Sequence, residues 1–206
     1  MKRLIIIGAG GHGKVVADIA DKQGGYGSIC FLDDGKRDDF IYPILGGVDA
    51  IEKFVKNSDF FVAIGNADTR KKITEKIRKA KGKIVSLFHP NAVIGANVVC
   101  GEGVVVMAGA VINSSSKIGN GVIINTCSSV DHDCIIGDYT HISVGAHIAG
   151  NVKIGDNTWI SAGAIVINNL EIVNDCIIGA GAVVVKNINE SGKYMGVPAK
   201  KKEATI

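Results

Sequence analysis

Residues 118–154 read IGNGVIINTCSSVDHDCIIGDYTHISVGAHIAGNVKI, and every sixth residue of this stretch is Ile or Val. The spacing continues outward from Ile94 to Val184, and Cys100 is the one position among sixteen that is neither Ile nor Val. An α-helix repeats every 3.6 residues and a strand every two, so neither explains a period of six. Such a repeat is typical of a parallel β-helix, whose short strands form the flat sides of a prism. β-branched side chains favour extended backbone and would fill its interior.

A second period of eighteen residues lies on top of the first. Glycine follows the aliphatic position at Gly101, Gly119, Gly137 and Gly155. We expect these glycines to supply the positive φ that a corner requires. Eighteen residues then make one turn with three sides, and the repeat gives about five turns stacked at the ~4.8 Å spacing of neighbouring strands.

The first 88 residues carry a different pattern, in which apolar runs alternate with helical ones. Expected strands cover residues 4–7, 29–32, 60–64 and 83–87, and expected helices cover 14–20 and 69–79. This alternation predicts a parallel sheet. We therefore expect a Rossmann-like α/β half domain at residues 1–88, a β-helix at 89–187 and a C-terminal tail at 188–206, with residues 186–196 as loop.

A glycine-rich loop, GAGGHG at residues 8–13, lies between the first expected strand and helix, the setting of the dinucleotide fingerprint. A nicotinamide or flavin site is one interpretation, but the domain is about half the length of a complete dinucleotide fold. A diphosphate held at the helix N-terminus is the second, and a turn that only packs the helix is the third. His12 can donate to a phosphate or sugar oxygen, so we favour a nucleotide sugar. Asp33 and Asp34, which end the next strand, could hold a ribose hydroxyl.

Composition excludes several classes of protein. Hydrophobic residues make up 47% and charged residues 21%, which indicates a folded chain, and a net charge of +3 is too small to argue for nucleic acid. Five cysteines without a CxxC motif fit a reducing compartment. The apolar run after the basic start is too short for a signal peptide or a membrane span, so we expect a cytoplasmic protein. Lysines 200–202 could attract cofactor phosphates, although a solvated tail is the simpler interpretation.

Polar residues in the repeat mark the candidate chemistry. His132 and Asp133 form a general-base arrangement if the strand bends between them, because the carboxylate would orient the ring and raise its basicity. A solvent-exposed corner is the alternative. His132, Gly150 and Asn168 are eighteen residues apart, so they form one column along a possible acyl-transfer groove.

His141 and Trp159 form another such column, half a turn away. His141 could meet His132 only through a neighbouring chain, so a site that uses both would lie between subunits of a cyclic trimer. His132, His141 and His147 also suggest zinc, but they fit that metal poorly, because His141 and His147 are one side apart and His132 occupies a different strand phase.

Five segments together carry a family resemblance across nearly the whole chain. They are GAGGHG at 8–13, FLDD at 31–34, AIGN at 63–66, residues 125–155 and GVPAK at 196–200. In this order they resemble the NeuD/PglD/PerB-type sugar acetyltransferases, above all those that act on UDP-4-amino-sugars in the bacillosamine pathway. The resemblance implies a left-handed β-helix, with acetyl-CoA as co-substrate and no metal.

The resemblance also implies residue roles. The base would be His132, and Asp133 stands where the nearest members have Glu, one methylene longer. Residues implied to hold the nucleotide sugar are Gly10, Gly11, His12, Asp33, Asp34 and Gly65. Residues implied to line the acetyl-CoA groove are His141, Gly150, Ala162 and Asn168.

The expected mechanism is direct transfer of the acetyl group to a sugar amine in glycan or polysaccharide precursor synthesis. His132 would take the proton, and a backbone N–H near Gly150 would stabilise the oxyanion. Cys134 falls on a core position, so no acyl-enzyme is expected. The alternatives are O-acetylation, as in sialic acid O-acetyltransferases, and a non-catalytic scaffold that binds nucleotide sugar. The residues do not distinguish UDP from GDP.

Overall fold

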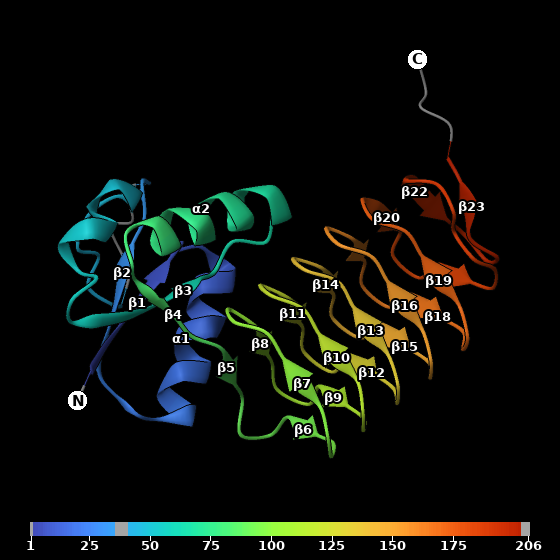
Figure 1. Ribbon diagram of the computed structural model, residues 1–206, viewed down its shortest axis with the longest axis horizontal. Coiled ribbons are helices and arrows are strands. Elements are labelled where there is room, and N and C mark those ends of the chain that lie inside the picture. Colours follow the sequence, from blue (N-terminus) through green and yellow to red (C-terminus); the bar gives the residue numbers. More distant parts are fainter. Residues whose placement is uncertain (1, 36–40, 203–206) are drawn as a thin grey trace. The chain divides into compact units, whose positions relative to one another are not determined.

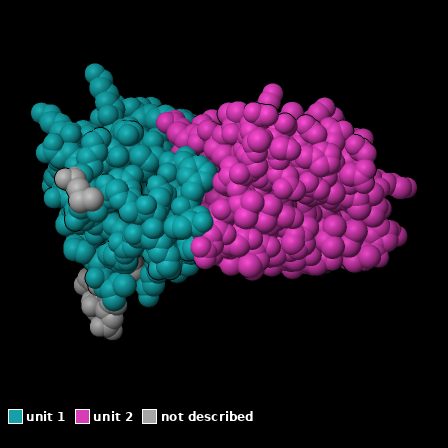
Figure 2. Space-filling view, turned by 90° about the horizontal axis from the view of Figure 1, so that it is seen from below, with its two compact units in different colours: residues 1–90 teal, residues 91–206 magenta. Residues whose placement is uncertain are grey.

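The computed structural model describes residues 2–35 and 41–202. The chain divides into two compact units, residues 1–90 and residues 91–206 (Figure 2). Each unit has its own regular architecture, and the candidate residues are divided between the two. None of the helices in the described ranges is long and apolar enough to cross a membrane.

The first unit is a four-stranded parallel sheet with helices packed on it (Figure 1). Its elements are β1 (Lys2–Ile7), α1 (Gly11–Gln23), β2 (Tyr26–Leu32), the 3₁₀ helix η1 (Val48–Lys53), β3 (Ser58–Val62), α2 (Ala67–Lys79), β4 (Lys83–Ile84) and β5 (Leu87–Phe88). The sheet order is β2-β1-β3-β4. Ile5, Leu32 and Phe60 lie in its buried core with Ile77 of α2. The expected strands and helices are confirmed, except that the last strand of the sheet is only β4, that β5 lies outside this sheet and that η1 was not expected.

The second unit is a parallel β-helix in which most strands have two residues (Figure 1). Its first side contains β6 (Val93–Ile94), β9 (Val111–Ile112), β12 (Ser129–Val130), β15 (His147–Ile148), β18 (Ile165–Val166) and β21 (Val183–Val184). Its second side contains β7 (Val99–Cys100), β10 (Lys117–Ile118), β13 (Ile135–Ile136), β16 (Lys153–Ile154) and β19 (Glu171–Ile172). Its third side contains β8 (Val105–Val106), β11 (Ile123–Ile124), β14 (His141–Ile142), β17 (Trp159–Ile160) and β20 (Cys176–Ile178).

Strand register repeats every eighteen residues, as the sequence predicts. Ile118 pairs with Ile136, and Ile124 pairs with Ile142. Ile124 and Ile142 are fully buried, and Ile136 is 1% exposed, so the sixth-position side chains fill the interior. The six-residue repeat is therefore the core of the β-helix.

The corner glycines differ from the expectation. Left-handed backbone at the corners belongs to other residues, including Asp133 with φ of 58° and Asn151 with φ of 57°. Gly119 has a different reason to be glycine: a β-carbon there would lie 2.8 Å from the backbone nitrogen of Asp138 and 2.9 Å from the carbonyl carbon of Gly137. These glycines allow successive turns to approach closely, and the expected positive φ is wrong for them.

The C-terminal segment is more ordered than a loop and a tail. Strand β22 (Gly192–Met195) pairs in parallel with β20, and β23 (Lys200–Lys201) pairs antiparallel with β22. Lys201 also forms an ion pair with Glu190 at 2.7 Å. The expectation of a plain loop at residues 186–196 is therefore wrong for residues 192–195, where β22 continues the third side.

Candidate active site

The first group of candidate residues lies at the corner between the first and second sides of the β-helix. Here the chain turns between β12 and β13, and Asp133 adopts a left-handed conformation. The turn brings adjacent side chains together, so that Nδ1 of His132 lies 2.8 Å from Oδ2 of Asp133. Both side chains are more than half exposed. A straight strand would have pointed them to opposite faces, so the corner creates the pair.

A second carboxylate supports the same histidine. Oδ1 of Asp131 accepts hydrogen bonds from the backbone N–H of His132, at 2.8 Å, and from Nδ2 of Asn113, at 2.7 Å. The hydrogen bond to Asp133 is the main cause that raises the pKa of His132 above its ordinary value, and the charges of Asp131 and Asp133 add to it. Asn113 is the main cause that lowers the pKa of Asp131. The imidazole is therefore made more basic from two directions.

The ring of His132 covers a glycine on the next turn. A β-carbon on Gly150 would lie 2.5 Å from Nε2 and 2.7 Å from Cε1 of His132. Any other residue at this position would therefore displace the ring from the place that it occupies in this structure. The eighteen-residue register predicts a column of His132, Gly150 and Asn168. The structure shows that the first two of these residues pack directly on each other.

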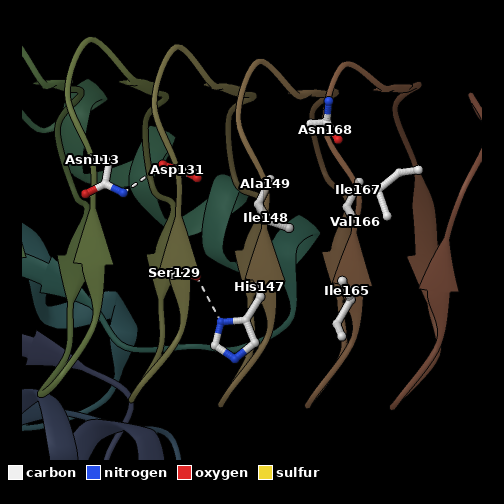
Figure 3. A pocket seen from close by; sticks show the side chains of 10 residues that line it. All are labelled: Asn113, Ser129, Asp131, His147, Ile148, Ala149, Ile165, Val166, Ile167 and Asn168. Carbon is white, nitrogen blue, oxygen red and sulfur yellow. Dashed lines mark hydrogen bonds between the residues drawn. The ribbon is translucent and has the colours of Figure 1, made fainter.

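A groove begins beside this corner and follows the first side (Figure 3). It has a volume of about 350 Å³. Asn113, Asp131 and Asn168 line its corner end, and His147 and Ile165 lie on the strands. Asn168, the third member of the His132 column, thus borders a concave surface. His147 does not reach that corner, since its Nδ1 contacts Oγ of Ser129 at 2.9 Å.

His141 lies on β14, on the third side, away from the corner of His132. Its Nε2 is 3.1 Å from Nδ2 of Asn125, and with that amide as donor Nε2 is the acceptor. The ring stacks on Trp159 with centroids 6.1 Å apart. Ala162 is exposed at the corner between the third and first sides. Within one chain, His132 and His141 thus lie half a turn apart, as the sequence predicts. A site between subunits that uses both residues stays a prediction.

The second group of candidate residues is the glycine loop of the first unit. Gly8 has φ of 102°, and a β-carbon there would lie 2.9 Å from the carbonyl oxygen of Ala63. A β-carbon on Gly13 would collide with the carbonyl oxygen of Gly8. Gly10 and Gly11, in contrast, have open space around them. The loop therefore contains two glycines required for packing and two that leave the helix N-terminus accessible.

Asp33 and Asp34 hold the surrounding loops. Oδ2 of Asp33 accepts a hydrogen bond from the backbone N–H of Ala9 at 2.6 Å, and Oδ1 accepts one from Gly35 at 2.7 Å. Asp34 accepts one from the N–H of Val48 at 2.8 Å. Both carboxylates thus hold main chain in place, and a contact with ribose stays a prediction.

His12 begins α1 and points its ring into the protein. Its Nε2 is enclosed and has no hydrogen-bond partner within the described structure. Burial lowers the pKa of His12 to about 4, with a further contribution from the charge of Arg70. The imidazole is therefore neutral near pH 7. Gly65, at the end of β3, faces open space.

Comparison with solved structures identifies the family. The acetyltransferase domain of PglB from Neisseria gonorrhoeae FA1090 is 40% identical, with a TM-score of 0.94, over 98% of this chain and 100% of that chain. This chain belongs to the PglD/PerB-type sugar acetyltransferases. PerB from Caulobacter crescentus, solved with CoA and GDP-perosamine, is 38% identical with a TM-score of 0.91 over 98% of both chains.

Sequence comparisons agree with this membership. The family described as the PglD N-terminal domain matches residues 3–77. UDP-N-acetylbacillosamine N-acetyltransferase from Bacillus subtilis (strain 168) is 33% identical over 114 residues. That match spans about half of this chain and about half of the curated relative, 52% of each.

Four residues of this PglD-type chain were given no role in the sequence analysis. Asp131 and its partner Asn113 are eighteen residues apart, so the register could have revealed them. Asn125 could have been found by its polarity in an apolar repeat. Arg70 gave no signal, because an arginine within a charged helix is usually exposed. In the structure its side chain is 1% exposed.

The described residues contain no group of three His, Cys, Asp or Glu side chains arranged to hold a metal ion. His132, His141 and His147 lie respectively at a corner, on the third side and on the first side. Cys134 is fully buried, and burial raises the pKa of its thiol. The PglD-type fold therefore presents an imidazole rather than a thiolate at this corner.

Proposed function

We propose that this protein is an acetyl-CoA-dependent N-acetyltransferase that acts on the amino group of a nucleotide-linked amino sugar. The observation that carries the proposal is the His132–Asp133 pair, whose Nδ1–Oδ2 distance is 2.8 Å, within a chain of this family. Relatives that match over 98% of this chain have been solved with acetyl coenzyme A and with CoA and GDP-perosamine. The curated relative is named for N-acetyl transfer to a UDP-linked sugar.

The base in the proposed reaction is Nε2 of His132. Asp133 accepts the Nδ1–H, which fixes the tautomer and leaves the Nε2 lone pair for the substrate. The sugar amine attacks the thioester carbonyl carbon, and its proton moves to Nε2 as the C–N bond forms. A backbone N–H near Gly150 stabilises the oxyanion. The intermediate then collapses, the C–S bond breaks, and the proton passes from His132 to the thiolate of CoA.

The nucleotide end of the sugar is assigned to the first unit. Gly10 and Gly11 leave the N-terminus of α1 open, where unpaired N–H groups favour a diphosphate. His12, Asp33, Asp34 and Gly65 surround this position in the proposal. A UDP-4-amino-4,6-dideoxy sugar is our preferred substrate, and a GDP-linked amino sugar is the other candidate. Acetyl-CoA would contact His141, Gly150, Ala162 and Asn168, with His141 from a neighbouring chain of a homotrimer, and we place the reaction in the cytoplasm.

The test is an incubation of the enzyme with acetyl-CoA and a panel of UDP- and GDP-linked amino sugars, with release of free thiol as the readout. We expect thiol release with a 4-amino sugar and an acetylated amine in the product by mass spectrometry. Acetylation of a hydroxyl instead would identify the enzyme as an O-acetyltransferase. Nucleotide-sugar binding without any thiol release would leave a non-catalytic scaffold as the function.

A further inference from the structure

The side chain of Arg70 is fully enclosed in the first unit, and the mechanism above does not use it. It lies in the first turns of α2 and is 1% exposed. A buried guanidinium is strongly disfavoured unless its N–H groups are satisfied. Its Nη1 donates to the carbonyl oxygens of Ile64 and Gly65, both at 2.8 Å. Arg70 therefore ties the helix to the chain segment that leaves β3.

That segment borders the glycine loop. Ala63 donates its backbone N–H to the carbonyl of Ile7 at 2.8 Å, so the ends of β1 and β3 are directly joined. A β-carbon on Gly8 would lie 3.1 Å from Cγ1 of Ile64. Ligands of open parallel sheets bind beyond the carboxyl ends of the strands, which is where both segments lie. Displacement of the Ile64–Gly65 carbonyls would therefore move the wall of the site proposed for the nucleotide sugar.

Arg70 also acts on His12 across this edge of the sheet. Its charge is the second cause, after burial, of the lowered pKa of His12. Among other charged groups, Asp33 binds the N–H groups of Ala9 and Gly35, and Lys14 and Asp18 of α1 are exposed. The enclosed Nε2 of His12 has no partner within the described structure. Buried polar atoms of native structures rarely lack a partner, so the ring of His12 is held in an unusual setting near Arg70.

We propose that Arg70 is a positioning residue of the nucleotide-sugar site, which holds the Ile64–Gly65 main chain in place and keeps the enclosed ring of His12 neutral at the wall of that site. This inference rests on the proposed function and deepens it. Arg70 touches neither the acetyl group nor the reacting amine in this scheme. Its loss should therefore raise KM for the sugar nucleotide and leave kcat and KM for acetyl-CoA nearly unchanged.

Two substitutions separate the geometry of Arg70 from its charge. Arg70→Lys keeps the charge but loses the planar fork, so it cannot bond both carbonyls in the same way. Arg70→Met loses both. We expect KM for the sugar nucleotide to rise about tenfold in Arg70→Lys and more in Arg70→Met, as the loss of one or two charge-assisted hydrogen bonds predicts.

The pKa of the His12 ring can be measured by NMR, with the signal assigned by its loss in His12→Asn. This pKa would not change if Arg70 only stabilised the fold. In the wild type the ring titrates at a pKa of about 4. Arg70→Met should raise this value, and it should stay below the ordinary one because burial remains. Arg70→Lys should leave it near the wild-type value.

Thr74→Val is the matched structural control. Thr74 is also buried on α2, and its hydroxyl donates to the carbonyl oxygen of Arg70 at 2.8 Å. This variant should lower the melting temperature and leave both KM values and the His12 titration unchanged.

Binding of UDP and GDP to the wild type, measured by calorimetry, separates the two proposals. If the wild type binds neither nucleotide nor an amino-sugar nucleotide, the proposed function fails. If the wild type binds and both Arg70 variants have its KM for the sugar nucleotide, the role of Arg70 is overturned. The role is also overturned if the variants lose affinity for both substrates as their stability falls. Should Arg70→Met fail to fold, Arg70→Lys alone decides through its KM for the sugar nucleotide.

Discussion

A β-carbon on Gly150 would lie 2.5 Å from Nε2 of His132, so the imidazole rests directly on the glycine of the next turn. This packing restricts the position of the ring on the side of Nε2 and Cε1. Asp133 fixes the same ring through Nδ1, at 2.8 Å. The position of the proposed base thus depends on one contact and one hydrogen bond, which can be removed separately.

Gly150→Ala should displace the ring without removal of the base. A misplacement of about 1 Å can cost ~10²-fold in rate, so we expect a loss of that order in kcat. Gly179→Ala is the control, because its β-carbon would also meet first a flexible side chain, at 2.8 Å from Cγ of Met195. Both variants should lose similar stability, measured by thermal melting, and only Gly150→Ala should lose kcat. Equal kcat in the two variants would contradict the role of the ring position.

His132→Ala should remove the proton acceptor. General-base removal typically costs ~10²–10⁴-fold, and the loss should fall on kcat, because the proton moves only in the transition state. Both KM values should change little. His147→Ala is the control: this exposed histidine bonds Ser129 on the first side and should leave kcat unchanged. We expect kcat to fall by at least ~10²-fold. If His132→Ala retains more than about a tenth of wild-type kcat, another residue is the base.

The pH dependence of kcat/KM should report the raised pKa of His132. The base must be unprotonated to act, so activity should fall as pH decreases through that pKa, which lies above the ordinary value of about 6.5. Asp133→Asn removes the main cause of the shift, so the acidic limb should move to lower pH while kcat falls less than in His132→Ala. An unshifted limb in Asp133→Asn would mean that the profile reports another group.

The sequence predicted most of the fold because each position of the repeat has one environment. A period of six places Ile124 and Ile142 inside, and eighteen residues align His132 with Gly150. The His132–Asp133 bond was harder to foresee, because it requires left-handed backbone at Asp133, where φ is 58°. The spacing of residues locates a corner but not the conformation of each residue in it.

The first unit was less predictable, since its site depends on tertiary contacts without a period. A contact of Asp33 with ribose stays a prediction, and nothing in the sequence indicated that this carboxylate accepts a hydrogen bond from the N–H of Ala9. Gly13 belongs to the fingerprint, but its contact with the carbonyl of Gly8 shows that it serves packing. No local signal marks Arg70 as buried, because its partners are main-chain carbonyls that any sequence provides.

The open glycines and the packed glycine of the loop should respond differently to substitution. Gly10→Ala places a methyl group where there are no neighbours within 4 Å, so the fold should tolerate it. The methyl group would occupy the approach of a diphosphate, and KM for the sugar nucleotide should rise while KM for acetyl-CoA stays unchanged. Gly13→Ala should instead lower the melting temperature. Equal changes in both KM values for Gly10→Ala would show that the two substrates are not divided as proposed.

A site shared between chains can be tested by complementation. His141→Ala should raise KM for acetyl-CoA, and His132→Ala should abolish most of kcat. If His132 of one chain meets His141 of its neighbour, random mixing of the two variants in a trimer should restore about a quarter of the sites. Activity at low acetyl-CoA, measured after co-expression, should then exceed the sum of the two variants purified alone. The wild type should also have the mass of a trimer by light scattering. If the mixed enzyme shows only the sum of the two activities, or if the wild type is fully active as a monomer, one chain contains a complete site. His141 would then have to act away from the corner at which His132 lies.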